Sequence, residues 1–275
     1  MLAIIKTEFE KIKRYHILLI GIVGMFCSPL LQLGSQAVMT EEARRANFDF
    51  AALIEMTIWG NAQIFMPVIF TLIGGYLINR EYTDDTLKNI LTVPVSFRKF
   101  MAGKLASVGI LAIILGIYSL GVTVVVAVCA NLSSISALVL LKGLLQMIGL
   151  SAGIYIAVLP IITICSRKPG QFMGGAVAAF ILGYCVLFFK EGLLRNIYPF
   201  SAALTMIGFD TASYSGTSGK GSIPLAVISL GSMLMISVLV IANAKMPGEA
   251  KRKHKKGNIS RRPAQRERLQ TTKGR

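Results

Sequence analysis

Apolar stretches of 18 to 26 residues alternate with short polar segments along most of the chain. Each is long enough to cross the roughly 30 Å hydrocarbon core of a bilayer as a helix. The pattern therefore predicts an all-α membrane protein, because a helix satisfies its backbone hydrogen bonds internally. The six predicted spans are Ile17–Gly34, Ile58–Ile78, Leu105–Ala130, Gly143–Ser166, Phe172–Phe189 and Ser222–Asn243.

Two shorter apolar patterns predict helices that do not span. The segment Ile197–Phe209 is too short to cross and is interrupted by Pro199, so it predicts short re-entrant outer helices before the last span; a plain surface helix is the alternative. The N-terminal arm has a helical apolar stripe and predicts an amphipathic helix at the membrane interface. The stripe consists of Leu2, Ile5, Phe9 and Ile12, with Lys6, Glu10 and Arg14 at four-residue spacing.

The distribution of basic residues predicts the orientation. Of the 29 lysines and arginines, 23 lie on the side of the N-terminus and six on the opposite side. Cytoplasmic segments carry the excess of positive charge, so both termini are predicted to be cytoplasmic. A cleavable signal peptide ending near Ser35-Gln36-Ala37 is the rival interpretation, but the 16-residue arm before the first span is unusually long and patterned for one.

Composition excludes a soluble domain: 54% of the residues are hydrophobic and 15% are charged, against about 25% charged in soluble proteins. No span has an ionisable residue in its middle, which argues against a proton-driven pump and against an intramembrane enzyme. Three uncharged polar residues remain, and they either line a substrate path or make hydrogen bonds between helices. These residues are Asn61, Gln63 and Gln146.

No metal or nucleotide site is expected in this chain. The four cysteines and two histidines match no ligand spacing. The Gly/Ser-rich segment 215–222 resembles a phosphate loop, but Lys220 is followed by glycine rather than by serine or threonine.

Residues 1–243 are predicted to form one membrane domain, and the basic tail 244–275 is predicted to be a disordered cytoplasmic topology anchor. Binding of the tail to anionic lipid or, nonspecifically, to RNA is the alternative.

The polar segment between the second and third spans has a short helical pattern. Thr83 can cap a helix, and Asp84 and Asp85 favour its positive end. Pro94 ends the pattern, after an apolar stripe that either rests on lipid headgroups or fits a groove on a soluble partner. The stripe is formed by Leu87, Ile90 and Leu91.

The order of residues in this segment resembles the signature of type-2 ATP-binding-cassette (ABC) exporter permeases, and the N-terminal arm resembles the interface helix of that family. The matching positions are Glu81, Thr83, Thr86, Leu87, Lys88, Ile90, Leu91, Thr92, Pro94, Val95, Ser96, Arg98 and Lys104. In the family this segment is the coupling helix, which contacts the ATPase subunit. The resemblance thus implies an ATPase interface at Glu81, Thr83, Asp84, Asp85, Thr86, Leu87, Lys88, Ile90, Leu91 and Pro94.

The resemblance also implies a function. Within the family the chain is most similar to the bacitracin and lantibiotic self-protection permeases, so we expect a non-enzymatic permease in a bacterial plasma membrane that exports an amphipathic peptide or drug. Its expected partners are a pair of cytoplasmic ATPase subunits, which bind ATP and Mg, and a second permease, identical or related. No specific nucleic acid partner is expected. The alternative is a membrane sensor or protective subunit that binds such compounds without moving them.

Overall fold

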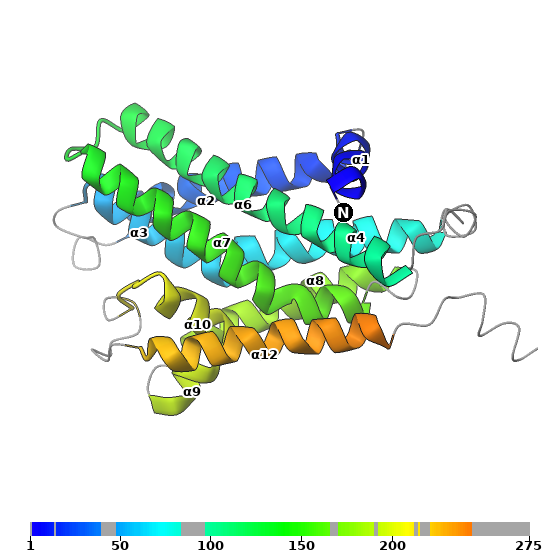
Figure 1. Ribbon diagram of the computed structural model, residues 1–275. Coiled ribbons are helices and arrows are strands. Elements are labelled where there is room, and N and C mark those ends of the chain that lie inside the picture. Colours follow the sequence, from blue (N-terminus) through cyan, green and yellow to red (C-terminus); the bar gives the residue numbers. More distant parts are fainter. Residues whose placement is uncertain are drawn as a thin grey trace, which may run out of the picture.

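The computed structural model describes residues 2–13, 15–39, 48–83, 97–165, 170–189, 192–211, 214 and 221–243, and within these ranges the chain is helical, without strands (Figure 1). The long helices are α2 (Ile17–Val38), α6 (Phe97–Cys129), α7 (Ala137–Cys165), α12 (Ile223–Ala242) and one made of α3 (Phe50–Gly60), η1 (Asn61–Phe65) and α4 (Met66–Thr83). The shorter ones are α1 (Leu2–Ile12), α8 (Gln171–Tyr184) with η2 (Cys185–Leu187), α9 (Gly192–Ile197) and α10 (Pro199–Met206).

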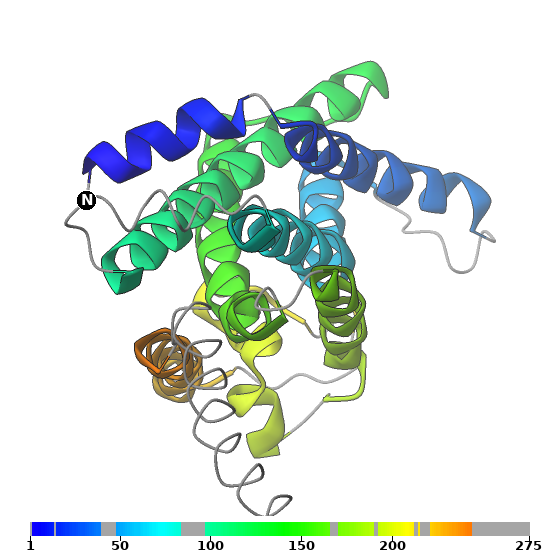
Figure 2. The ribbon, with the colours of Figure 1, turned by 90° about the vertical axis from the view of Figure 1, so that its right-hand side faces the viewer.

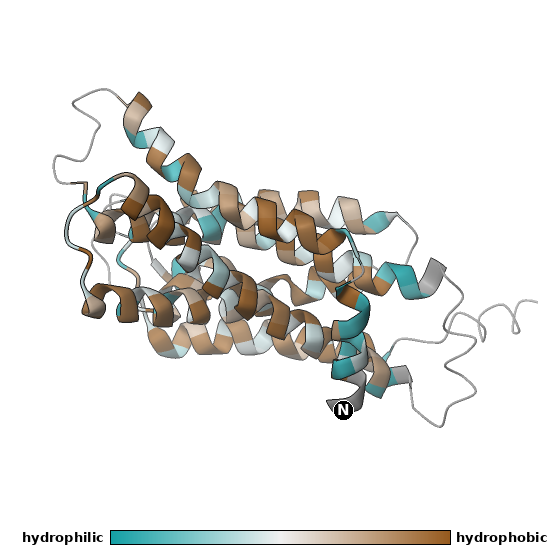
Figure 3. Ribbon diagram, turned by 90° about the horizontal axis from the view of Figure 1, so that it is seen from above, coloured by the Kyte–Doolittle hydropathy of each residue, from teal (hydrophilic) through white to brown (hydrophobic). Residues whose placement is uncertain are grey.

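The long helices run side by side in an elongated bundle with two distinct ends (Figure 1). At one end, here called the α1 end, α1 lies crosswise to the bundle and packs on α6 (Figure 2). Helix α4 ends and α6 begins at this same end, and α12 also ends there. The opposite end, here called the α10 end, carries α9 and α10. Hydrophilic residues gather on α1 and near the helix ends, whereas the middles of the helices are apolar (Figure 3).

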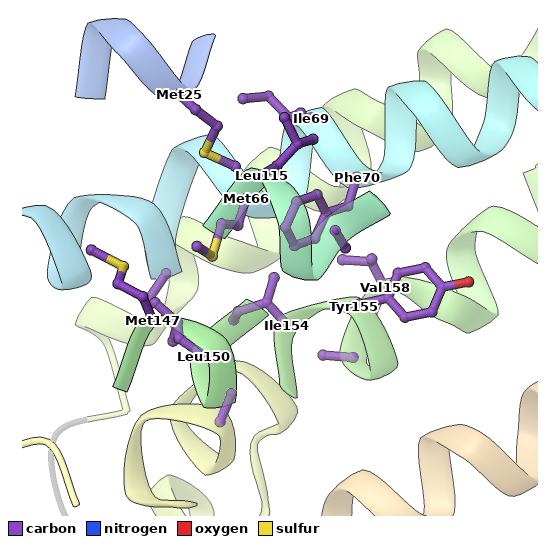
Figure 4. Close-up of a cluster of buried hydrophobic side chains, with 14 of the residues drawn as sticks. Met25, Met66, Ile69, Phe70, Leu115, Met147, Leu150, Ile154, Tyr155 and Val158 are labelled. Carbon is purple, nitrogen blue, oxygen red and sulfur yellow. The ribbon is translucent and has the colours of Figure 1, made fainter. Parts of the chain in front are cut away.

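The continuous helix α3–η1–α4 forms the centre of the bundle. It is buried along most of its length, while α2 and α12 expose most of their apolar residues, as expected for helices that face lipid. The core around it is rich in methionine, whose flexible side chain fills irregular gaps between helices (Figure 4). The core residues labelled in Figure 4 are Met25, Met66, Ile69, Phe70, Leu115, Met147, Leu150, Ile154, Tyr155 and Val158, and they come from α2, α4, α6 and α7.

The prediction of an all-α polytopic membrane protein is confirmed. Among the described residues, five helices are long and apolar enough to cross a membrane. The predicted span Phe172–Phe189 is a shorter helix, since α8 and η2 cover 17 residues, or about 25 Å at 1.5 Å per residue. The second span is longer than predicted, because its helix begins at Phe50 rather than at Ile58.

The predicted short helices before the last span are also present. Helix α10 packs against both α7 and α12, and residues 200–205 are all buried. The segment therefore folds back into the bundle and is not a plain surface helix. The predicted helix after Thr83 and the basic tail 244–275 lie outside the described residues.

Helix α8 packs closely against η1 and α4, and a glycine permits it. A Cβ atom placed on Gly183 of α8 would lie 2.2 Å from the carbonyl oxygen of Gln63 and 3.1 Å from the ring of Pro67. No side chain larger than hydrogen fits there without moving the two backbones apart. Gly174, on the same helix, has nothing within 4 Å of its Cβ position.

We therefore expect Gly183→Ala to destabilise the protein by about 1–3 kcal/mol, the usual cost of forcing extra volume into a packed core. Gly174→Ala is the matched control and should leave the free energy of unfolding nearly unchanged or slightly raised, since alanine favours the helix. Denaturation of the purified protein in detergent micelles measures both. Equal stabilities for the two variants would contradict the assigned α4–α8 packing.

Candidate functional site at the α1 end

Four charged side chains from three helices form a closed ring of ion pairs at the α1 end. The Lys104 ammonium on α6 lies 2.9 Å from Glu8 Oε2 on α1 and 2.5 Å from Glu81 Oε1 on α4. Lys11, also on α1, lies 3.2 Å from Glu8 Oε1 and 3.7 Å from Glu81 Oε1. Charges alternate around the ring in the order Glu8, Lys104, Glu81, Lys11, so every neighbour is of opposite sign. We call these four residues the charge ring.

Helix geometry places the members of the charge ring. Glu8 and Lys11 are three residues apart on α1, so their side chains share one face of that helix. Glu81 lies two residues before the end of α4, and Lys104 lies in the second turn of α6. The ring therefore joins α1 to the two helix ends that flank residues 84–96.

Three of the four side chains are almost completely buried. The side chains of Lys104 and Glu8 are each 2% exposed, that of Glu81 is 7% exposed and that of Lys11 is 43% exposed. A buried charge is tolerated only when it is paired and hydrogen-bonded. Removing one partner of a buried ion pair costs about 3–5 kcal/mol because it leaves the other charge uncompensated. The position of α1 is thus tied to the burial of Lys104.

Lys11 closes the ring on its exposed side. Burial disfavours its ammonium form, but the carboxylates of Glu8 and Glu81 outweigh this and raise its pKa above the ordinary value of 10.5. A raised folded-state pKa means that the Lys11 contribution is fully present below about pH 10.5 and is lost only as the pH rises through the higher value. Lys11 therefore stays charged at physiological pH.

Aromatic contacts extend the α1 end toward α8. The Arg80 guanidinium lies 4.1 Å from the centre of the Tyr15 ring and donates a hydrogen bond to the Tyr76 hydroxyl. Tyr76 in turn packs edge-on against both Tyr15 and Phe172, the second residue of α8. A guanidinium over an aromatic face is attracted by the ring quadrupole. These contacts hold the turn between α1 and α2 against α4 and α8.

Of the predicted ATPase interface, the structure describes Glu81, which is a ring member, and the backbone of Thr83, which ends α4. The remaining residues of that interface lie outside the described residues: Asp84, Asp85, Thr86, Leu87, Lys88, Ile90, Leu91 and Pro94. The assignment of this segment stays a prediction. Sequence reasoning missed Glu8 and Lys11. The signal for Glu8 was present, because it falls within the apolar stripe of α1, three residues after Ile5 and four before Ile12.

A second polar cluster lies in the middle of the bundle around Asn61. The Ser28 hydroxyl on α2 donates to Asn61 Oδ1 at 2.6 Å, and Asn61 Nδ2 donates to the Ser119 hydroxyl on α6 at 3.0 Å. All three residues are completely buried. Asn61 therefore links three helices, as expected for hydrogen bonding between helices. We call these three residues the Asn61 node.

Asn61 also begins a turn of π-helix, η1, between α3 and α4. The Met66 amide donates to the carbonyl oxygen of Asn61, five residues back. Pro67 has no amide hydrogen, so it cannot donate to the carbonyl of Gln63 as an α-helical residue would. The side-chain amide nitrogen of Gln63 is buried and has no hydrogen-bond partner among the described residues. Single π-turns of this kind occur frequently at functional sites.

The third predicted polar residue, Gln146, lies elsewhere and donates to the carbonyl of Ile207 at 3.4 Å. The structure thus brings Asn61 and Gln63 together on one π-turn, with Gln146 directed toward the chain after α10. Whether these three residues line a substrate path stays a prediction. No group of three or more potential metal ligands occurs in the described part of the chain.

The α10 end is held by aromatic stacking and a buried arginine. Trp59 on α3 stacks on Tyr214 and Phe209, with ring centres 4.9 and 6.2 Å apart. The buried Arg195 of α9 donates to the Thr211 hydroxyl. The stacked rings attach the chain after α10 to α3, and the arginine ties α9 to that same chain segment.

The helices and the two polar clusters define a multi-pass membrane protein whose charged site lies at one end of the bundle. The family of ABC-2 family transporter proteins matches residues 4–186, about two thirds of the chain, and the chain belongs to this family. It is also similar to the bacitracin transport permease protein BCRB of Bacillus licheniformis, with 32% identity over 94 residues. That match covers 34% of this chain and 45% of the relative.

The Asn61 node leads to a prediction about stability. We expect Asn61→Leu, which keeps the number of side-chain heavy atoms and removes both hydrogen bonds, to lower the free energy of unfolding by about 1 kcal/mol, in the range measured for hydrogen bonds between membrane helices. Gln146→Leu is the control, because it removes one long hydrogen bond and should cost less. Denaturation in mixed detergent micelles gives both values. A fully stable Asn61→Leu variant would show that the node holds nothing together.

Proposed function

We propose that this chain is the permease subunit of an ATP-driven exporter and that it exports a bacitracin-like or other amphipathic peptide from a bacterial plasma membrane. The observation that carries the proposal is the charge ring, which fixes the ends of α4 and α6 beside α1. Residues 84–96 join those two ends, so this segment is anchored at both of its ends. The anchored ends lie on the side that carries most of the basic residues. A segment that transmits a movement of a soluble partner to the membrane helices needs fixed ends.

Family membership supports the division of labour in this proposal. The sequence lacks a phosphate-binding motif, so ATP and Mg would be bound by a separate pair of ABC ATPase subunits and not by this chain. A second permease, identical or related, would complete the path. Both termini would lie in the cytoplasm, as the distribution of lysine and arginine predicts. The peptide substrate is suggested by the name of the relative from Bacillus licheniformis.

Transport of the peptide can be measured directly. The chain is co-expressed with the ABC ATPase encoded nearest to its own gene, and inside-out vesicles are given fluorescent bacitracin and ATP. An exporter should accumulate the peptide in the vesicles only with ATP, and an ATPase variant without its catalytic carboxylate should not. Binding of bacitracin without ATP-driven accumulation would instead identify a sensor or protective subunit.

The contact with the ATPase can be tested on the predicted helix that follows Thr83. Burying a leucine or isoleucine side chain contributes roughly 1.5–3 kcal/mol, so Leu87→Asp with Ile90→Asp should remove most of the binding energy. Membrane insertion should persist, and the ATPase should no longer co-purify with the tagged chain. The matched control is Lys88→Ala with Asn89→Ala, on the opposite face, which should keep the complex. Retention of the ATPase by the double aspartate variant would assign the apolar stripe to the lipid surface instead.

A further inference from the structure

The charge ring has more partners than a stabilising ion pair needs. Lys104 and Glu81 lie 2.5 Å apart and would neutralise each other without α1. Helix α1 nevertheless contributes two further members, and Glu8 is as deeply buried as Lys104. Burial of an additional carboxylate is costly unless it is matched, and Lys11 supplies that match from the same helix. The arrangement therefore makes α1 a structural partner of both helix ends.

We propose that α1 is a positioning element, which sets the relative position of the ends of α4 and α6 through the charge ring and so prepares them for the ATPase. This assignment rests on the function proposed above. If the ends of α4 and α6 were flexible, they would have to be ordered when the ATPase binds, and the entropy lost in that ordering would weaken binding. Glu8 and Lys11 are the positioning residues, because they connect α1 to Glu81 and Lys104.

Charge exchange can distinguish a closed ring of four charges from two independent ion pairs, because each member of a ring has two neighbours. Exchange of Glu8 and Lys104 reverses both charges, and it then places position 104 against Glu81 and position 8 against Lys11 with like signs. An exchange would restore an independent pair, but it breaks a ring. Only the inversion of all four charges restores alternation. The four substitutions are Glu8→Lys, Lys11→Glu, Glu81→Lys and Lys104→Glu.

The first measurement follows the docking of α1 without any partner. Spin labels at Lys6→Cys on α1 and Lys99→Cys on α6, both exposed positions, report the distance between the two helices in a background without the native cysteines. The wild-type ring should give one narrow distance distribution, and Glu8→Gln should broaden it. Glu10→Gln, two residues away on the exposed face of α1, is the matched control and should leave the distribution narrow. A broad distribution for the wild-type ring would overturn the proposal.

The second measurement uses the protein in lipid nanodiscs with the same ABC ATPase as above. Glu8→Gln and the Glu8/Lys104 exchange should each raise the apparent Kd for the ATPase about fivefold or more, the lower range of ordinary coupling between sites. Glu10→Gln and the four-charge inversion should bind as the wild type does. Lys11→Met, with Lys6→Met as control, repeats the test at the half-exposed member of the ring.

Each other outcome has a defined meaning. A broadened distance with unchanged ATPase affinity would reduce the ring to a purely structural role and overturn the proposal. Full rescue by the two-residue exchange would replace the ring with independent pairs. If the wild-type chain binds no ATPase while its distance distribution is narrow, the proposed function fails and the functional half of this inference fails with it.

Discussion

The burial of one ammonium group, that of Lys104, is the constraint on which the α1 end of the molecule depends. A lysine that is 2% exposed cannot be left without compensating charge; Glu81 of α4 supplies it, and Glu8 of α1, buried against the same ammonium, ties α1 to this pair. This requirement brings three helices to one point and fixes the crosswise position of α1, which hydrophobic contact alone would leave free to slide along the membrane surface. Directional ionic contacts therefore define the register at this end, whereas nondirectional apolar packing fills the rest of the bundle.

The two ends and the middle of the bundle are held by interactions of different strength. The α1 end has the charge ring and a cation–π contact, and the α10 end has stacked aromatic rings and the buried Arg195. Between them the polar contacts are neutral hydrogen bonds such as those of Asn61. Hydrogen bonds between helices within a membrane contribute on average about 0.6 kcal/mol, because alternative partners are available in the unfolded state. Breaking a buried ion pair costs several times more.

Most of the fold could be predicted from hydropathy, and the charge ring could be predicted only in part. Helices α2, α6, α7 and α12 follow from long apolar runs, because lipid leaves the backbone no other choice. The extension of the second helix to Phe50 was missed, since helices continue past the membrane wherever packing supports them. Glu81 and Lys104 are both in the sequence signature, but their contact is formed across an intervening segment. Glu8 was missed because an acid within an apolar stripe has no evident partner until the tertiary structure brings one.

These differences in strength indicate where the bundle is rigid and where it can rearrange. The central helix passes from the charge ring to the π-turn at Asn61, where Pro67 has already removed one backbone hydrogen bond of the regular helix. A bend there exchanges weak hydrogen bonds beside the amide nitrogen of Gln63, which has no partner in the described part of the chain, whereas displacement of Glu81 would expose or strand a buried charge. The lower cost lies at the π-turn. The weaker polar contacts of the central helix therefore lie at the π-turn, and its strong ones lie at the end near Thr83.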